Sequence, residues 1–331
     1  MEKSPMVSVI MSVYKEPIEW LNQSIDSILN QTFTDFEFII ICDNPQFSEG
    51  ISLLRNLAEK ENRIVLLFNE ENIGLTKSLN KGLAIAKGNY IARMDADDIS
   101  CTIRLEREIE YLENNDTIDI CCSNFSYIDE NGNVIKNKVV PIKRRSQDYL
   151  LWHNVFGHST VMFRRSVLKA RNPLYNESYR CAQDYELWTY LSSCGLLIGF
   201  VDNVLLLYRQ STHQISAKKS EEQLHNLETA RRCYIYSLLK NNKIIVNDTD
   251  VDAKILLERI NKAYPDFSDA EKRKMDRIIY ILYYTLSCKS PKYVARYFAD
   301  LRMRKMEHWI RDDVRLLFAP ILGEKHKSMI L

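Results

Sequence analysis

The sequence lacks the motifs and the compositional extremes that mark several large classes of protein. Glycine and proline supply only 9 and 8 of 331 residues, and 46 % of the residues are hydrophobic, which excludes fibrous and disordered chains. No G-x-G-x-x-G follows the first apolar run and no G-x-x-x-x-G-K-[ST] occurs anywhere, so neither a dinucleotide enzyme nor a P-loop nucleotidase is supported. No apolar run reaches the roughly 18 residues of a membrane-spanning helix.

Disulfide, zinc and secretion signatures are missing as well. The eight cysteines show no C-x-x-C spacing, which favours a reduced protein over a disulfide-linked or zinc-binding one. The N-terminus runs straight into a strand-like segment, without the charged region, long apolar stretch and cleavage site of a signal peptide. We therefore expect a cytoplasmic protein.

Charge and hydrophobic pattern divide the chain into two parts. Residues 1–217 carry 22 basic against 28 acidic side chains, and residues 218–331 carry 23 against 16. In the first part, apolar runs of strand length alternate with helix-period segments, which predicts an α/β fold with a largely parallel sheet between helices. The second part consists of successive segments with helical periodicity, with capping boxes at Ser220 and Ser268. We predict one domain over 1–217 and a helical domain over 218–331.

The predicted sheet places polar residues at one of its edges. The expected strands are Val7–Val13, Phe36–Cys42, Ile64–Phe68 and Tyr90–Met94. Ligands of open parallel sheets bind beyond the carboxyl ends of the strands. Tyr14, Asp43 and the acidic cluster that begins at Asp95 each follow a strand directly, so we expect them to share one crevice.

Three carboxylates lie within four residues, at Asp95, Asp97 and Asp98. So much negative charge is costly unless a cation or solvent compensates it. Carboxylate oxygens are preferred ligands of Mg²⁺ and Mn²⁺, which usually bind one or two protein carboxylates together with substrate phosphates. The cluster therefore predicts a metal-bridged nucleotide site. The alternative is an acidic loop that stabilises the N-terminus of a helix starting near Ile103.

Several motifs follow one another in a characteristic order between Val7 and about Ser216. They are VSVIMSVY (7–14), SILNQTF (27–33), NIGL (72–75), ARMDADD (92–98) with RL (104–105), AQDYELW (182–188), YR (208–209) and QIS (214–216). Together they resemble family 2 glycosyltransferases of the GT-A fold, the bacterial type that builds capsule, O-antigen or lipooligosaccharide glycans. The resemblance implies the GT-A nucleotide-diphospho-sugar transferase fold, a mostly parallel sheet flanked by helices, followed by a C-terminal helical region.

The resemblance assigns residues to the base of a UDP-sugar. Ser12 and Tyr14 match the strand end where such enzymes hold uracil, and Asp43 matches the acidic residue that accepts a hydrogen bond from the base. The alternative for Tyr14 is an ordinary aromatic residue at the end of a strand, and the alternative for Asp43 is an aspartate that forms a turn. The segment Cys42-Asp43-Asn44-Pro45 departs from the more familiar Asp-Asp-Gly-Ser, which bears on base selectivity.

The resemblance also assigns the diphosphate site. Asp95 would lie near the ribose and Asp97 would hold a divalent cation, Mn²⁺ or Mg²⁺, with both counted as metal ligands. Asp98 is expected to cap a helix or to support the other two. Lys77 and Arg209 would contact phosphate, although an exposed helix position is the alternative for Lys77.

Asp184 is the expected general base. It matches the aspartate of the family's acidic pair, and it would take the proton of the acceptor hydroxyl in a single displacement with inversion. The partner that usually precedes it is Glu, and this chain has Gln183; losing a like-charged neighbour should make Asp184 easier to ionise. The alternative is that Asp184 caps a helix over residues 185–193.

Two histidines and a tryptophan complete the expected site. His158 and Trp188 are assigned to the acceptor pocket or to orienting the base, with a hydrogen-bonded structural histidine as the alternative for His158. His213 is either structural or part of a basic loop, with Arg209, that covers the diphosphate.

The implied function is transfer of a hexose or N-acetylhexosamine from a UDP-sugar to a hydroxyl of a growing, lipid-linked surface glycan. The alternatives are a non-catalytic sugar-nucleotide or carbohydrate-binding protein and a sugar nucleotidyltransferase. A basic amphipathic series at the C-terminal end suits an anionic membrane surface, which would place the enzyme peripherally on the inner face of the cell membrane. The alternatives for this basic series are a solvent-exposed helix face and a surface through which two chains pair. No nucleic-acid partner is expected. The series is Arg296, Arg302, Arg304, Lys305, Arg311 and Arg315.

Overall fold

The computed structural model describes residues 4–140, 147–151, 153–211, 221–244, 253–287, 290 and 292–304. The chain divides into two compact units. Unit 1 comprises Met1–Leu150 and Asn154–Asn226, and unit 2 comprises Leu151–His153 and Leu227–Leu331. The main boundary between them lies within helix α6 (Glu221–Asn241), a little beyond the predicted residue 217.

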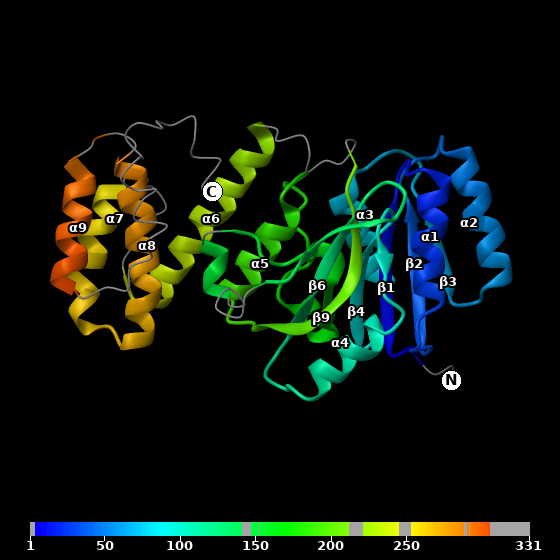
Figure 1. The fold of residues 1–331 in the computed structure, drawn as a ribbon, viewed down its shortest axis with the longest axis horizontal. Helices are drawn as coiled ribbons and strands as arrows, with labels where there is room; N and C mark the ends of the chain where they lie inside the picture. Colours follow the sequence, from blue (N-terminus) through cyan, green and yellow to red (C-terminus); the bar gives the residue numbers. More distant parts are fainter. Residues whose placement is uncertain are drawn as a thin grey trace. The chain divides into compact units, whose positions relative to one another are not determined.

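Unit 1 is built on a mixed sheet, in which the described strands have the order β3-β2-β1-β4-β8-β6-β9-β5, with β7 beside β6 (Figure 1). The strands are β1 (Val7–Val13), β2 (Phe36–Cys42), β3 (Ile64–Phe68), β4 (Tyr90–Asp95), β5 (Ile99–Ser100), β6 (Ile120–Ile128), β7 (Val134–Lys138), β8 (Val161–Arg164) and β9 (Ile198–Arg209). The α/β prediction is confirmed, and β3, β2, β1 and β4 are parallel. Beyond β4 the sheet is mixed, because β8 runs antiparallel to both β4 and β6.

Helices cover both faces of the parallel half of the sheet. The helices of unit 1 before α6 are α1 (Ile18–Leu29), α2 (Ser48–Lys60), α3 (Leu75–Ile85), α4 (Arg104–Glu113) and α5 (Gln183–Ser193). Met11 of β1 shares a hydrophobic core with Leu21 and Ile25 of α1. Ile10 faces α3, which lies so close that a Cβ on Gly82 would come within 2.9 Å of the Ile10 side chain. Successive side chains of a strand point to opposite faces, so a strand covered on both sides is apolar along its length.

Unit 2 is helical where it is described. After α6 its helices are α7 (Ala253–Ala263), α8 (Asp269–Ser287) and α9 (Lys292–Arg304), and α8 packs against both α7 and α9. The buried side chains here include Leu257, Ile260, Tyr283 and Tyr297. The capping box predicted at Ser268 is confirmed, because the backbone N–H and the hydroxyl of Ser268 donate to Glu271 Oε2 at 2.8 and 2.6 Å. The one predicted at Ser220 lies outside the described residues.

The predicted membrane-facing series is described only in part. Arg296 is exposed on α9. The side chains of Arg302, Arg304, Lys305, Arg311 and Arg315, and the segment 213–216 that contains His213, lie outside the described part of the chain. Among the described helices, none has the length and the apolar character needed to cross a membrane.

Candidate active site

Three strand ends bring the predicted site residues to one edge of the sheet. β1 lies between β2 and β4, and Ser12 is paired with Ile41 on one side and with Asp95 on the other. Tyr14 and Asp43 directly follow β1 and β2. Ser12 is half-buried, whereas Tyr14 is 38 % exposed. The carboxyl ends of these parallel strands therefore meet as the sequence predicted.

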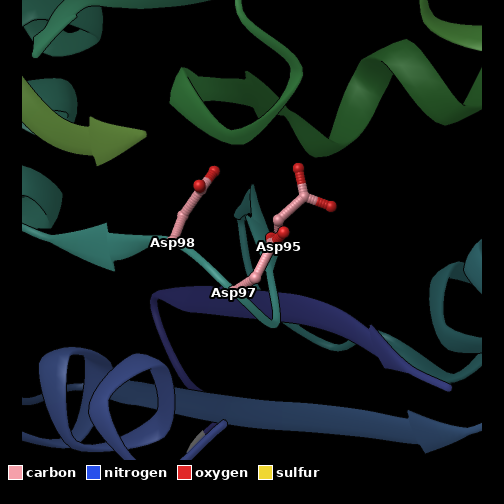
Figure 2. A group of neighbouring side chains, drawn as sticks. All are labelled: Asp95, Asp97 and Asp98. Atoms are coloured by element: carbon pink, nitrogen blue, oxygen red, sulfur yellow. The ribbon is translucent and has the colours of Figure 1, made fainter. Parts of the chain in front are cut away.

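Asp95, Asp97 and Asp98 form a compact acidic cluster where β4 ends. One carboxylate oxygen from each residue lies within 4.8 Å of the other two. Figure 2 shows Asp95 and Asp98 extending to the same side of the loop. Asp95 and Asp97 are half-buried, and Asp98 is completely buried. Three carboxylates at this spacing form a dense negative site of the kind that binds hard cations.

Asp95 is held by groups from three different parts of the chain. The Arg93 guanidinium pairs with Oδ1, the Ser159 hydroxyl donates to Oδ2, and the Ser24 hydroxyl donates to the backbone oxygen at 2.8 Å. Burial raises the pKa of the Asp95 carboxyl, but the charge of Arg93 and these hydrogen bonds outweigh burial and bring the pKa below its ordinary value. Asp95 is therefore an ionised carboxylate in a fixed orientation.

Asp98 and Arg209 fix the rest of the acidic loop. Oδ1 of Asp98 accepts the backbone N–H of Arg209 at 2.9 Å, while Oδ2 is buried and makes no hydrogen bond of normal geometry among the described residues, although the Ser159 hydroxyl lies near enough to act on the carboxyl. Burial, followed by the charges of Asp97 and Asp95, raises the pKa of Asp98 well above its ordinary value. The Arg209 side chain is fully buried, and its Nε donates to the backbone oxygen of Asp97 at 2.8 Å. Arg209 thus supports the loop from β9.

Asp43 holds the loop that leads into α3. Its Oδ1 accepts hydrogen bonds from the backbone N–H of Ile73 at 2.9 Å and from Asn69 Nδ2 at 2.8 Å, and its Oδ2 accepts the N–H of Gly74 at 2.8 Å. Gly74 has a φ of +87°, a conformation that glycine adopts without a steric cost. A carboxylate offers about four lone-pair positions, so these contacts leave room for one more donor.

Replacing Asp43 with alanine is expected to lower stability and weaken donor binding together. The N–H groups of Ile73 and Asn69 would lose this acceptor, which costs about 1–3 kcal/mol each where water cannot replace it, while the Gly74 N–H would keep Asn72. Thermal unfolding and calorimetry with UDP would measure both effects. Asn72→Ala is the matched control, since Asn72 Oδ1 is a second, exposed acceptor for the Gly74 N–H; we expect it to change stability by less than about 0.5 kcal/mol. Equal effects of the two substitutions would contradict the role of Asp43.

Asp184 lies in the first turn of α5, which begins at Gln183 and has Ala182 as its N-cap residue, so the alternative that Asp184 caps a helix over 185–193 is wrong. Its side chain is half-buried, and Oδ2 accepts a hydrogen bond from Asn154 Nδ2 at 2.7 Å. Asn154 is oriented in turn, because its Oδ1 accepts the backbone N–H of Phe156 at 3.2 Å. Burial raises the pKa of Asp184 above its ordinary value, although hydrogen bonds and Arg93 oppose the rise. A carboxylate with a raised pKa and a fixed orientation can act as a general base.

His158 and Trp188 lie together near this base. His158 Nε2 is 2.7 Å from the Tyr175 hydroxyl, and the ring centroids of His158 and Trp188 are 6.1 Å apart. Burial, with the nearby charge of Arg93, lowers the pKa of His158 well below its usual range, so the ring is neutral at pH 7. Trp188 is only 1 % exposed, and its Nε1 has no hydrogen-bond partner in the described part of the protein.

Lys77 is exposed on α3 and borders an open groove with a volume of about 440 Å³. The groove is lined by Ile73, Lys77, Asn80, Lys81, Ala84 and Glu177. Lys81 Nζ donates to Asn69 Oδ1 at 2.8 Å, and Asn69 also contacts Asp43. The groove therefore begins beside the loop that Asp43 holds.

Comparisons with known proteins identify the family. The model of the family described as "Glycosyl transferase family 2" matches residues 8–171. An uncharacterized glycosyltransferase of Haemophilus influenzae is 30 % identical over 297 residues, which cover 86 % of this chain and 88 % of that protein. The O-antigen biosynthesis glycosyltransferase WbnJ of Escherichia coli is 36 % identical over 218 residues, covering 65 % and 83 %. The chain belongs to glycosyl transferase family 2.

Solved structures support the fold of this family 2 glycosyltransferase. Residues 1–349 of S. aureus TarS, in complex with UDP-GlcNAc, superpose with a TM-score of 0.58 at 16 % identity, covering 98 % of this chain and 91 % of that one. At this identity the likeness concerns the fold alone. It confirms the predicted GT-A α/β fold and extends over the C-terminal helices.

The acidic cluster of this family 2 glycosyltransferase fits a divalent cation. Its donors are all carboxylate oxygens, the ligands that Mg²⁺ and Mn²⁺ prefer. Asp98 Oδ2 supplies an independent observation, since it is a buried acceptor that makes no hydrogen bond of normal geometry among the described residues. A buried polar atom in that state is costly, and a bound cation would satisfy it.

Four further residues belong to the site of this glycosyltransferase although the sequence did not single them out. Ser159 and Asn154 contact predicted residues from distant parts of the chain, whereas Arg93 pairs with Asp95 two positions along the same strand. Glu16 is a fourth acid at the same edge: its Oε2 accepts the Tyr14 N–H at 2.8 Å, and burial, assisted by Asp97 and Asp95, raises its pKa to about 7. Two of the four had a local signal: Glu16 is an acid two positions after Tyr14 at the end of a strand, and Arg93 lies within the motif ARMDADD.

Proposed function

We propose that this chain is a metal-dependent, inverting glycosyltransferase that moves a hexose or N-acetylhexosamine from a UDP-sugar to a hydroxyl of a growing surface glycan. The observation that carries the proposal is the acidic cluster at the carboxyl ends of the parallel strands, together with Asp184, a half-buried candidate base whose pKa is influenced by Arg93 beside that cluster. The name of the E. coli relative supports a glycan of the O-antigen type, and the UDP-GlcNAc complex of TarS supports a UDP-sugar donor.

The donor would bind along the three strand ends. Ser12, Tyr14 and Asp43 are assigned to the uracil, with the half-exposed Tyr14 ring available for stacking. Asp95 and Asp97 are assigned to the cation, with Lys77 as a phosphate contact. The cation would offset the negative charge that gathers on the nucleoside diphosphate as the sugar bond breaks. We assign Arg209 to loop support, in place of the phosphate contact expected from the resemblance, because its guanidinium is buried against the Asp97 backbone.

The acceptor would be activated by Asp184. This carboxylate takes the proton of the attacking hydroxyl, while the hydrogen bond from Asn154 to one of its oxygens fixes its orientation. His158 and Trp188 are assigned to the acceptor pocket or to orienting the base, where a neutral imidazole adds no charge beside Asp184. Proton transfer by a positioned base contributes about 10²–10⁴-fold to such reactions.

A lipid-linked acceptor would bring the enzyme to the inner face of the cell membrane. Arg296 and the basic residues that follow it in the sequence would then contact anionic headgroups. Pairing of two chains through the helical unit is the competing use of this surface. Binding to anionic liposomes, compared at low and high salt, distinguishes the two, since only headgroup contact weakens as salt screens the charges.

A panel of sugar nucleotides tests the proposed function. Purified protein with Mn²⁺ or Mg²⁺ is incubated with UDP-, GDP- and dTDP-sugars, and release of the nucleoside diphosphate is followed, with slow transfer to water as a sufficient signal. We expect one UDP-sugar to be hydrolysed and EDTA to abolish the reaction. If no donor is turned over and calorimetry finds no metal-dependent nucleotide binding, the proposal is wrong and a non-catalytic carbohydrate-binding protein becomes the better account.

A further inference from the structure

Arg93 is a buried cation between the acidic loop and the turn that carries His158. It lies in β4, two residues before Asp95, and is only 3 % exposed. Its Nη1 donates to Ser159 Oγ at 2.9 Å, and its Nη2 pairs with Asp95 Oδ1. The Ser159 hydroxyl donates in turn to Asp95 Oδ2. The side chains of Arg93, Ser159 and Asp95 therefore form a closed ring of contacts, in which each carboxylate oxygen of Asp95 has its own partner.

The ring joins the donor side of the site to the acceptor side. Ser159 belongs to the short turn His158–Thr160, and β8 follows that turn and pairs with β4. His158, the neighbour of Ser159, contacts the Tyr175 hydroxyl. Any shift of Arg93 or Ser159 therefore moves both the first carboxylate of the acidic cluster and the turn beside the candidate base.

Stability alone does not account for this arrangement. A buried ion pair is weak support for a fold, because removing two charges from water costs about as much as their attraction returns. Burial of Arg93 has a further free-energy cost, because its Nε has no hydrogen-bond partner within the described chain. An apolar side chain would fill this position in a buried strand at lower cost. A role of the Arg93 charge in the function of the site explains its presence better than a role in stability does.

We propose that Arg93 and Ser159 act as positioning residues that clamp Asp95 and so divide the work of the acidic cluster. Both oxygens of Asp95 are engaged by the clamp, whereas Asp97 is half-buried and Asp98 Oδ2 makes no hydrogen bond of normal geometry, with the Ser159 hydroxyl acting on Asp98 only as a minor influence. The cation is then held chiefly by Asp97 and Asp98, and the clamp keeps the Asp95 carboxylate in one orientation. This inference rests on the proposed function, and it refines the assignment of Asp95 as a metal ligand.

Arg93→Met is the decisive variant, because methionine matches the apolar length of the side chain and removes its charge. Freeing Asp95 to approach the cation, and removing a competing positive charge, should tighten Mn²⁺ binding about two- to tenfold in calorimetry. The kcat for donor hydrolysis should fall about 10–100-fold, because a small misplacement of a positioned group is enough for a loss of this size. Ser159→Ala should change the Mn²⁺ affinity and kcat in the same directions but by smaller amounts, because the charge of Arg93 remains.

Arg63→Met is the matched control. Arg63 also pairs with a carboxylate, Glu61, at 2.7 Å, but it lies at the start of β3, away from the strand ends that form the site. It should leave Mn²⁺ binding and kcat unchanged. If Arg93→Met fails to fold, Ser159→Ala carries the test alone.

Two results would overturn the clamp. One is Mn²⁺ affinity equal to that of the unchanged protein in both Arg93→Met and Ser159→Ala. The other is a loss of Mn²⁺ affinity that parallels a loss of Tm, which would indicate support of the fold only. The wild-type protein distinguishes an error in the clamp from an error in the proposed function. If wild-type protein binds Mn²⁺ and hydrolyses a donor, only the clamp proposal is wrong. If it does neither, the clamp proposal and the proposed function are both wrong.

Discussion

Asp97→Ala is expected to lower kcat/KM for donor hydrolysis at least a thousandfold. Charge stabilisation by a bound cation is worth several kcal/mol in the transition state, and about 4 kcal/mol corresponds to three orders of magnitude in rate. The substitution should leave the loop in place, because Arg209 binds the backbone oxygen of Asp97 and Asp98 binds the backbone N–H of Arg209. Loss of activity can then be attributed to the carboxylate.

The measurements are nucleoside diphosphate release and calorimetric Mn²⁺ binding, on protein whose Tm is unchanged. Asp116→Ala is the matched control, since Asp116 is an exposed aspartate in the connection between α4 and β6. It should retain full activity. An Asp97→Ala variant that keeps more than about a tenth of the activity would rule out a metal site centred on this residue.

Asp184→Asn is expected to lower kcat about 10²–10⁴-fold and to leave donor binding unchanged. An amide cannot take a proton from the acceptor hydroxyl, and this range is the usual contribution of a general base. Asparagine keeps the shape of the side chain and can still accept the hydrogen bond from Asn154. KM for the donor and the calorimetric Kd of UDP should therefore stay within about threefold of the starting values.

The pH dependence of kcat gives a second test of Asp184. The base must be deprotonated to work, and burial raises the pKa of Asp184, so activity should fall with decreasing pH at a point above the ordinary aspartate range. Glu186→Gln is the control: Glu186 pairs with Arg171 at 2.7 Å, so its loss should lower Tm and leave this acid limb in place. If Asp184→Asn keeps the acid limb and most of kcat, another group is the base.

The parallel half of the fold could be predicted from the sequence because its signal is local. The strands Val7–Val13, Phe36–Cys42 and Ile64–Phe68 were predicted with the bounds that the structure has, since strands covered on both faces are apolar along their whole length. β4 differs only by its last residue, Asp95. The mixed half had no such signal: β5 has two residues, and β9 carries the exposed pair Asp202 and Asn203 within its length.

The acidic cluster and the candidate base could be predicted because family motifs mark them. Their partners Asn154 and Ser159 could not, because these contacts join distant segments: Asn154 and Asp184 are 30 residues apart, and Ser159 and Asp95 are 64 apart. The burial of Arg209 is a further example. Motif position indicated a charged residue near the site, but only the packing of β9 beneath the acidic loop determines whether its guanidinium faces a ligand or the protein.

The contact between Arg209 and Asp98 also bears on how the enzyme becomes active during synthesis. The two residues are separated by 111 positions, and contacts of long sequence separation form late, because a large loop must close before they contribute. Chains emerge from the ribosome N-terminal end first. A nascent chain that ends before β9 therefore carries the whole acidic motif but lacks the strand that holds it, so cation and donor binding should begin only after Arg209 has been released and has docked.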